Sequence, residues 1–147
     1  MNKLPKKEQI KLELDGESKG DVIKELIELI DKSGNLTSVE EFHKDILARE
    51  KKGSTGMGKG VAIPHVRSHA VRETTLAFAR AKEGVEFNSL DGDLAKLFFM
   101  IAVPKQGSQE YLNTLAHLSQ QLRHDEFRKK LLTAETKEEV RTILKKA

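Results

Sequence analysis

The sequence TGMGKGVAIPH, residues 55–65, joins a glycine-rich loop to a short apolar segment that ends in Pro64 and His65. Residues 61–63 are so apolar and so few that we expect them to form a buried strand. Because proline has no N–H for a sheet ladder, this strand should end at Pro64 and present His65 at its rim. The loop glycines can adopt positive φ, which would let several backbone N–H groups point into one concavity and bind an anion. The pattern predicts a rigidly held histidine beside an anion site.

Polar residues close to this stretch are candidate partners of His65. Arg49 falls at the end of a predicted helix, beside the loop of residues 51–60. Its guanidinium has a fork that suits phosphoryl oxygens, although a surface charge favoured by the helix C-terminus would explain the residue equally well. The hydroxyl of Thr55 or of Ser54 could donate to the same oxygens. These residues predict a site in which His65 accepts a phosphoryl group.

Three apolar segments predict further strands outside this stretch. Ile10, Leu12 and Leu14 alternate with polar residues, as in a half-buried strand. Residues 74–79 are strand-like, and residues 97–103 form a continuous apolar run that is typical of a strand covered on both faces.

Capping boxes mark the starts of helices. Ser18 with Asp21, Ser38 with Glu41 and Thr136 with Glu139 each fit the pattern, and Ser108 can cap a further helix. The second helix is expected to bury its apolar side chains, Phe42, Ile46 and Leu47.

The order of strand, helices, strands and helices predicts an α/β fold. We expect a single domain over residues 1–147, with a central mixed sheet flanked by helices and a frayed segment at 1–8.

Composition excludes several classes of protein. The 147 residues include no cysteine, which rules out disulfides and thiolate metal sites and favours a reducing compartment, so we expect a cytoplasmic protein. The longest apolar run, residues 97–103, is far shorter than the roughly 20 residues of a membrane span, so we expect no direct membrane insertion. The net charge is +3, but basic residues are interleaved with acidic ones, so we expect no nucleic-acid partner.

The segments 49–50, 54–58 and 60–65 together closely resemble the active-site signature of the fructose/mannitol-type enzyme IIA domains. These domains belong to the bacterial sugar phosphotransferase system, and its nitrogen-regulatory members share the pattern. Weaker similarity runs from roughly Ile10 to Leu144. The resemblance implies that Nε2 of His65 accepts a phosphoryl group from phosphorylated HPr. It also implies that Arg49 stabilises the charge of the phosphate.

The resemblance leaves two outputs open. In one, the chain passes the phosphoryl group to a IIB component for sugar transport. In the family the IIB component receives the group on a cysteine, and this sequence has none, so the resemblance leads us to expect a IIB component on a separate polypeptide. In the other, the chain is a nitrogen-related regulator whose phosphorylation state controls its binding to partner proteins.

Tyr111 marks a departure from the family pattern. Family members often carry a second histidine at the start of the helix that follows the long apolar strand, and Tyr111 stands at that place. Its hydroxyl can donate a hydrogen bond but cannot carry positive charge at pH 7. The alternative is an ordinary half-buried helix residue. His117 cannot substitute, because six further residues turn a helical side chain by about 240°.

No metal or cofactor is expected. His65 and His69 are four residues apart, a spacing that could bind zinc on a helix, but residues 60–72 offer no third ligand. Transfer from a phosphohistidine donor also needs no metal.

Apolar and basic residues around the rim of the predicted site are candidates for docking HPr, namely Met57, Lys59, Val66 and Arg67.

Overall fold

Strand β6, Ala95–Pro104, lies at the centre of the sheet. The structure is a computed structural model that describes residues 3–106 and 109–147, so the cap expected at Ser108 lies outside the described residues. Every side chain from Leu97 to Val103 is buried, as the continuous apolar run predicts. Alternate residues of β6 contribute to two hydrophobic clusters on opposite faces, so β6 is covered on both sides.

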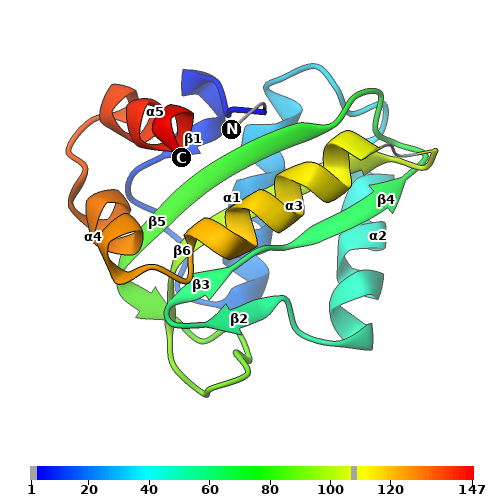
Figure 1. The fold of residues 1–147 in the computed structure, drawn as a ribbon. Coiled ribbons are helices and arrows are strands. Elements are labelled where there is room, and N and C mark those ends of the chain that lie inside the picture. Colours follow the sequence, from blue (N-terminus) through cyan, green and yellow to red (C-terminus); the bar gives the residue numbers. More distant parts are fainter. Residues whose placement is uncertain (1–2, 107–108) are drawn as a thin grey trace.

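The described residues form a mixed sheet of six strands in the order β1-β5-β6-β3-β2, with β4 also paired to β6. β5 is antiparallel to β6, whereas β3 and β4 are parallel to it. The predicted mixed α/β sheet is therefore confirmed (Figure 1). The remaining strands are β1 Ile10–Lys11, β2 Gly56–Gly58, β3 Val61–Ala62, β4 His65–Ser68 and β5 Thr75–Val85.

Helices cover both faces of this sheet (Figure 1). One cluster packs α1, Lys19–Asp31, and α2, Val39–Lys52, against the sheet. The other packs α3, Gln109–Gln121, α4, Asp125–Thr133, and α5, Lys137–Lys146, on the opposite face. No helix in the described part of the chain is long and apolar enough to cross a lipid bilayer.

The predicted helix starts are confirmed at three positions. The hydroxyls of Ser18, Ser38 and Thr136 each accept a hydrogen bond from the backbone N–H three residues later. These bonds satisfy N–H groups that have no partner inside the first helical turn. The short apolar stripes that follow each cap then face the sheet.

Pro64 divides one edge of β6 between two strands. β3 ends before the proline, at Ala62, and β4 begins after it, at His65. Both strands pair in parallel with β6, with Val61 opposite Leu97 and His65 opposite Ile101. The proline lacks an N–H, but its carbonyl accepts from Ile101 N at 2.9 Å, so pairing resumes at once. His65 therefore begins a second strand instead of lying beyond the end of the sheet.

Two sequence expectations differ from the structure in detail. Leu47, expected to be buried, is 39% exposed, because Phe42 and Ile46 lie four residues apart on the packed stripe of α2 and Leu47 is turned away from it. Residues 3–8, within the segment expected to be frayed, make contacts with α5. Arg141 Nε donates to the carbonyl of Pro5 at 3.0 Å.

Candidate active site

His65 is held through one of its two ring nitrogens. Its Nδ1 lies 2.6 Å from the carbonyl oxygen of Ile63, two residues earlier in the chain. A carbonyl can only accept, so Nδ1 carries the proton and the lone pair stands on Nε2. The ring is half-buried at the start of β4. The Ile63 carbonyl is the fixed acceptor that a neutral, nucleophilic imidazole needs, and residue types alone did not reveal it.

The surroundings of His65 favour its neutral form. Burial is the largest cause and lowers the pKa of His65 below its usual 6.5, and the positive charge of Arg49 lowers it further. The bond to the Ile63 carbonyl and the negative charge of Glu50 act in the opposite direction without reversing the shift. The imidazole is therefore neutral at pH 7, with Nε2 available to attack an electrophile.

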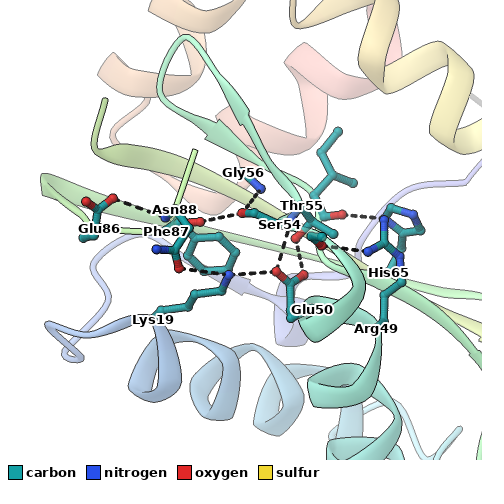
Figure 2. A network of polar contacts seen from close by, with 12 residues as sticks. Lys19, Arg49, Glu50, Ser54, Thr55, Gly56, His65, Glu86, Phe87 and Asn88 are labelled. Atoms are coloured by element: carbon teal, nitrogen blue, oxygen red, sulfur yellow. Dashed lines mark hydrogen bonds and ion pairs between the residues drawn. The ribbon is translucent and has the colours of Figure 1, made fainter. Parts of the chain in front are cut away.

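Arg49 comes from the last turn of α2, and its side chain extends toward the His65 ring (Figure 2). Its Nη1 donates to the carbonyl of Gly53 at 2.8 Å, which fixes the direction of the guanidinium. A guanidinium has five N–H donors. The bond to Gly53 uses one of these donors, which is compatible with a bidentate contact between the rest of the fork and an anion at His65. The structure thus brings the two principal predicted residues together.

Thr55 and Ser54 lie beside the site, but their hydroxyls already have acceptors. Thr55 is buried, and its hydroxyl donates to Glu50 Oε2 while its backbone N–H donates to Glu50 Oε1 at 3.1 Å. The hydroxyl of Ser54 donates to the carbonyl of Phe87 at 2.7 Å. In this structure neither hydroxyl is free to donate to a phosphate. Thr55 instead supports the site through Glu50 (Figure 2).

The glycine loop does not form the open anion cradle expected from its sequence. Besides the Thr55 N–H, the N–H of Gly56 donates to Ser54 Oγ at 3.0 Å and that of Lys59 to Asp91 Oδ2 at 2.8 Å. Gly56 instead allows close packing, because a Cβ there would lie 2.6 Å from Ser89 Oγ. The prediction was wrong for these N–H groups because side-chain oxygens already accept from them, those of Glu50 and Ser54 from nearby in the chain and that of Asp91 from 32 residues after Lys59.

Tyr111 lies beside the predicted acceptor. Its ring centroid is 6.1 Å from that of His65, with 36° between the ring planes. The guanidinium carbon of Arg67 lies 5.5 Å from the Tyr111 centroid, in the geometry of a cation–π contact. α3 therefore supplies an aromatic residue beside His65, at the position where the family resemblance implies a second histidine.

Two of the other predicted residues, His69 and Val66, lie outside the site around His65. His69 is exposed in the turn after strand β4, so the helical spacing that could bind zinc does not exist here. No group of three histidine, aspartate or glutamate residues within 3–106 and 109–147 could hold a metal ion. Val66 packs against the cluster under α1 and α2, on the sheet face opposite to His65, because neighbouring strand residues alternate in direction. It therefore does not belong to the rim around His65.

A groove continues from the site along α3. It has a volume of about 490 Å³ and lies between α3 and the β2–β3 hairpin. Met57 and Lys59, two of the residues expected at the docking rim, line it, and Met57 is 46% exposed. Ile63, whose carbonyl holds His65, lines the same groove. The groove is largely apolar, and it approaches the site at Ile63, whereas His65 itself does not line it.

Residues 3–147 match the family described as "Phosphoenolpyruvate-dependent sugar phosphotransferase system, EIIA 2". The chain therefore belongs to this family of phosphotransfer components. The match covers the whole sheet, all the described helices and the residues around His65, so the family resemblance drawn from three short segments is confirmed.

Two fructose-specific relatives differ in how much of their length this chain covers. The chain is 40% identical over 138 residues to the "PTS system fructose-specific EIIABC component" of Bacillus subtilis, covering 94% of this chain but only 22% of that protein. It is 39% identical to the "PTS system fructose-specific EIIA component" of Haloferax volcanii, covering 93% of this chain and 89% of that protein. The chain thus spans most of the length of one relative and about a fifth of the other.

Solved structures share the fold along nearly the whole chain. The nitrogen regulatory protein IIA-Ntr of Neisseria meningitidis superposes with a TM-score of 0.89 at 36% identity, covering 96% of both chains. The mannitol enzyme IIA of Escherichia coli, in its complex with phosphorylated enzyme IIB, superposes with a TM-score of 0.80 at 25% identity and covers 95% of this chain and 96% of that one.

Proposed function

We propose that this chain is a phosphocarrier that stores a phosphoryl group on Nε2 of His65. The observation that carries the proposal is the 2.6 Å contact between His65 Nδ1 and the Ile63 carbonyl, which leaves the lone pair on Nε2 beside the guanidinium of Arg49. The donor is an HPr-like phosphohistidine protein, and the acceptor is a IIB component. The proposed compartment is the cytoplasm, in keeping with the absence of cysteine.

The transfer reaction needs little from the protein beyond position and charge. The Nε2 lone pair of His65 forms the new N–P bond while the N–P bond of the donor breaks and its electron pair returns to the donor imidazole. The phosphoryl group passes through a loose, metaphosphate-like state, so in-line placement matters most. Arg49 counters the charge on the phosphoryl oxygens, and the Ile63 carbonyl stabilises the positive charge that develops on the His65 ring.

Thr55 and Tyr111 have supporting parts in this proposal. Thr55 holds the carboxylate of Glu50 in place through its N–H and its hydroxyl. Tyr111 lies beside the His65 ring and offers a hydroxyl donor, but a phenol cannot supply positive charge. The groove along α3, with Met57 and Lys59 on its wall, would receive the apolar part of a docking partner.

Phosphorylation by a purified donor system tests the proposal. The chain is incubated with enzyme I, HPr and phosphoenolpyruvate, and its mass is measured under conditions that preserve acid-labile phosphate. We expect one phosphoryl group per wild-type chain, none on the His65→Ala variant and full labelling of the His69→Ala variant, whose histidine lies outside the site. Full labelling of His65→Ala would remove His65 as the acceptor.

A second output is supported by similarity to IIA-Ntr of Neisseria meningitidis, whose name is that of a nitrogen regulatory protein. In that case phosphorylation changes which proteins the chain binds, because it adds charge and acceptor oxygens to a docking surface. Two measurements separate the outputs. Loss of the phosphoryl group to a candidate IIB component supports transport, whereas retention of the group together with phosphorylation-dependent binding of a target supports regulation.

A further inference from the structure

A continuous series of hydrogen bonds connects the start of α1 to His65, although 46 residues separate Lys19 from the histidine in the sequence. Lys19 Nζ lies 2.9 Å from Glu50 Oε1, and Glu50 accepts from the N–H and the hydroxyl of Thr55. The carbonyl of Thr55 accepts from Ile63 N at 3.0 Å. The carbonyl of Ile63 then accepts from His65 Nδ1. Figure 2 shows the side chains of this network converging on the loop that precedes β2.

The charged pair in this series is largely removed from water. The side chain of Glu50 is 6% exposed and that of Lys19 is 21% exposed. Lys19 Nζ also lies 4.7 Å from the centroid of the Phe87 ring and 3.4 Å from Asn88 Oδ1, so it is held on several sides. Desolvation of a buried pair commonly cancels much of its Coulomb attraction, which makes such pairs weak evidence for stability alone. The position of this pair, beside the proposed acceptor, gives it a different use.

We propose that Lys19 and Glu50 are positioning residues for the phosphoryl-acceptor histidine. Glu50 fixes the Thr55 segment on which the Ile63–His65 mount is hydrogen-bonded, and Lys19 fixes and partly neutralises Glu50. This role deepens the phosphocarrier function proposed above and rests on it for its consequence in phosphoryl transfer. Its effect on the protonation of His65 can be measured without any transfer.

The charged and titratable groups near His65 determine the direction of this effect. α2 contributes Arg49 and Glu50, α3 contributes Tyr111, and β4 contributes Arg67, which stacks on Tyr111. Glu50 is the negative group that raises the pKa of His65. When Lys19 is removed, the charge of Glu50 is less compensated and acts more strongly on the ring. Protonated His65 then becomes more abundant near neutral pH, and it has no lone pair for attack.

NMR titration of His65 in the intact chain tests this role. We expect Lys19→Met to raise the pKa of His65 by about half a pH unit, and Glu50→Gln to lower it. Lys19→Arg should keep the wild-type value because it retains the charge. Lys24→Met is the matched control, since Lys24 is exposed on the same helix and takes no part in the network. Thermal unfolding of each variant shows that it is folded under the conditions of the titration.

The double variant Lys19→Met/Glu50→Gln gives the sharpest result. If Lys19 acts through Glu50, its removal leaves the pKa of His65 unchanged once the carboxylate is gone. A Lys19→Met shift that persists in the Glu50→Gln background, or a Lys19→Met titration identical to that of wild type, overturns the proposal. Acceptance from phosphorylated HPr is measured in parallel against pH, and its acid limb should move upward in Lys19→Met. Failure of the wild-type chain to accept phosphate would count against the phosphocarrier function alone, because the titration still decides the role of Lys19.

Discussion

The ring centroids of Tyr111 and His65 lie 6.1 Å apart with 36° between the ring planes, although the two residues come from different layers of the fold, α3 and the sheet. This placement puts the phenol ring beside the histidine that is the proposed phosphoryl acceptor. The guanidinium of Arg67 lies over the Tyr111 ring in a cation–π contact. Substitutions of Tyr111 therefore test whether a side chain of α3 contributes to phosphoryl acceptance by His65.

Replacing Tyr111 by phenylalanine should slow phosphoryl acceptance. The ring and its stack with Arg67 remain in Tyr111→Phe, so the variant removes only the hydroxyl, a neutral hydrogen-bond donor of about 1 kcal/mol, and the expected loss is about fivefold. Tyr111→His restores a donor that can also become charged and should accept at least as fast as wild type. Rapid-quench measurement of transfer from phosphorylated HPr gives the rates. Equal rates in all three proteins would show that Tyr111 has no role.

Removing the charge of Arg49 should affect both the histidine and the transfer rate. Its positive charge helps to lower the pKa of His65, so Arg49→Gln is expected to raise that pKa in an NMR titration. The same variant loses the donors proposed for the phosphoryl oxygens, and acceptance should fall by about 100-fold or more. Lys51→Gln, an exposed cation on the same last turn of α2, is the control. A normal rate in Arg49→Gln would contradict the charge-stabilising role.

The lowered pKa of His65 also predicts a pH dependence of stability. The unfolded chain has the usual histidine pKa near 6.5, and the folded chain has a lower one, so the unfolded state binds more protons once the pH falls below about 6.5. His65 therefore costs no stability above that pH and reduces stability progressively as the pH falls toward the folded pKa. Urea unfolding should show that His65→Gln loses less stability than wild type between pH 6.5 and 5.5. Parallel curves for the two proteins would contradict the lowered pKa.

Gly56 and Gly20 should respond oppositely to the same substitution. A Cβ on Gly56 would lie 2.6 Å from Ser89 Oγ and 2.9 Å from Ser89 Cα, so Gly56→Ala forces the loops apart and should cost about 1–3 kcal/mol of unfolding free energy. A Cβ on Gly20, within α1, meets nothing within 4 Å, and Gly20→Ala should stabilise the chain by up to about 1 kcal/mol. Urea denaturation measures both. Equal destabilisation by the two changes would contradict the packing described for Gly56.

The features predicted well from sequence are those whose physical cause is local. Residues 97–103 predict the central strand because both of its faces are apolar. Helix starts are predicted at Ser18, Ser38 and Thr136 because each capping side chain bonds within its own first turn. The positions of Arg49 and Tyr111 near His65 came from the family pattern, and the structure brings all three together.

Two of the features missed depend on contacts between residues that are far apart in the chain. Glu50 was visible in the motif without a role, because its bond to Lys19 joins two helices and its bonds to Thr55 close a loop. The loop N–H groups were expected to be open, yet Asp91, 32 residues after Lys59, accepts one of them. Leu47 was assigned to the core because the sequence of α2 does not show how wide its buried apolar face is. That face includes Phe42 and Ile46 but not Leu47.

The carbonyl of Ile63 has a consequence for chemical modification as well. It occupies the Nδ1 side of the His65 imidazole, so a reagent arriving from solvent meets one nucleophilic atom where free histidine offers two. Alkylating or acylating reagents should therefore give a single regioisomer on this residue. The direction of one backbone carbonyl thus decides which isomer of modified histidine the chain can form, before any partner protein has bound.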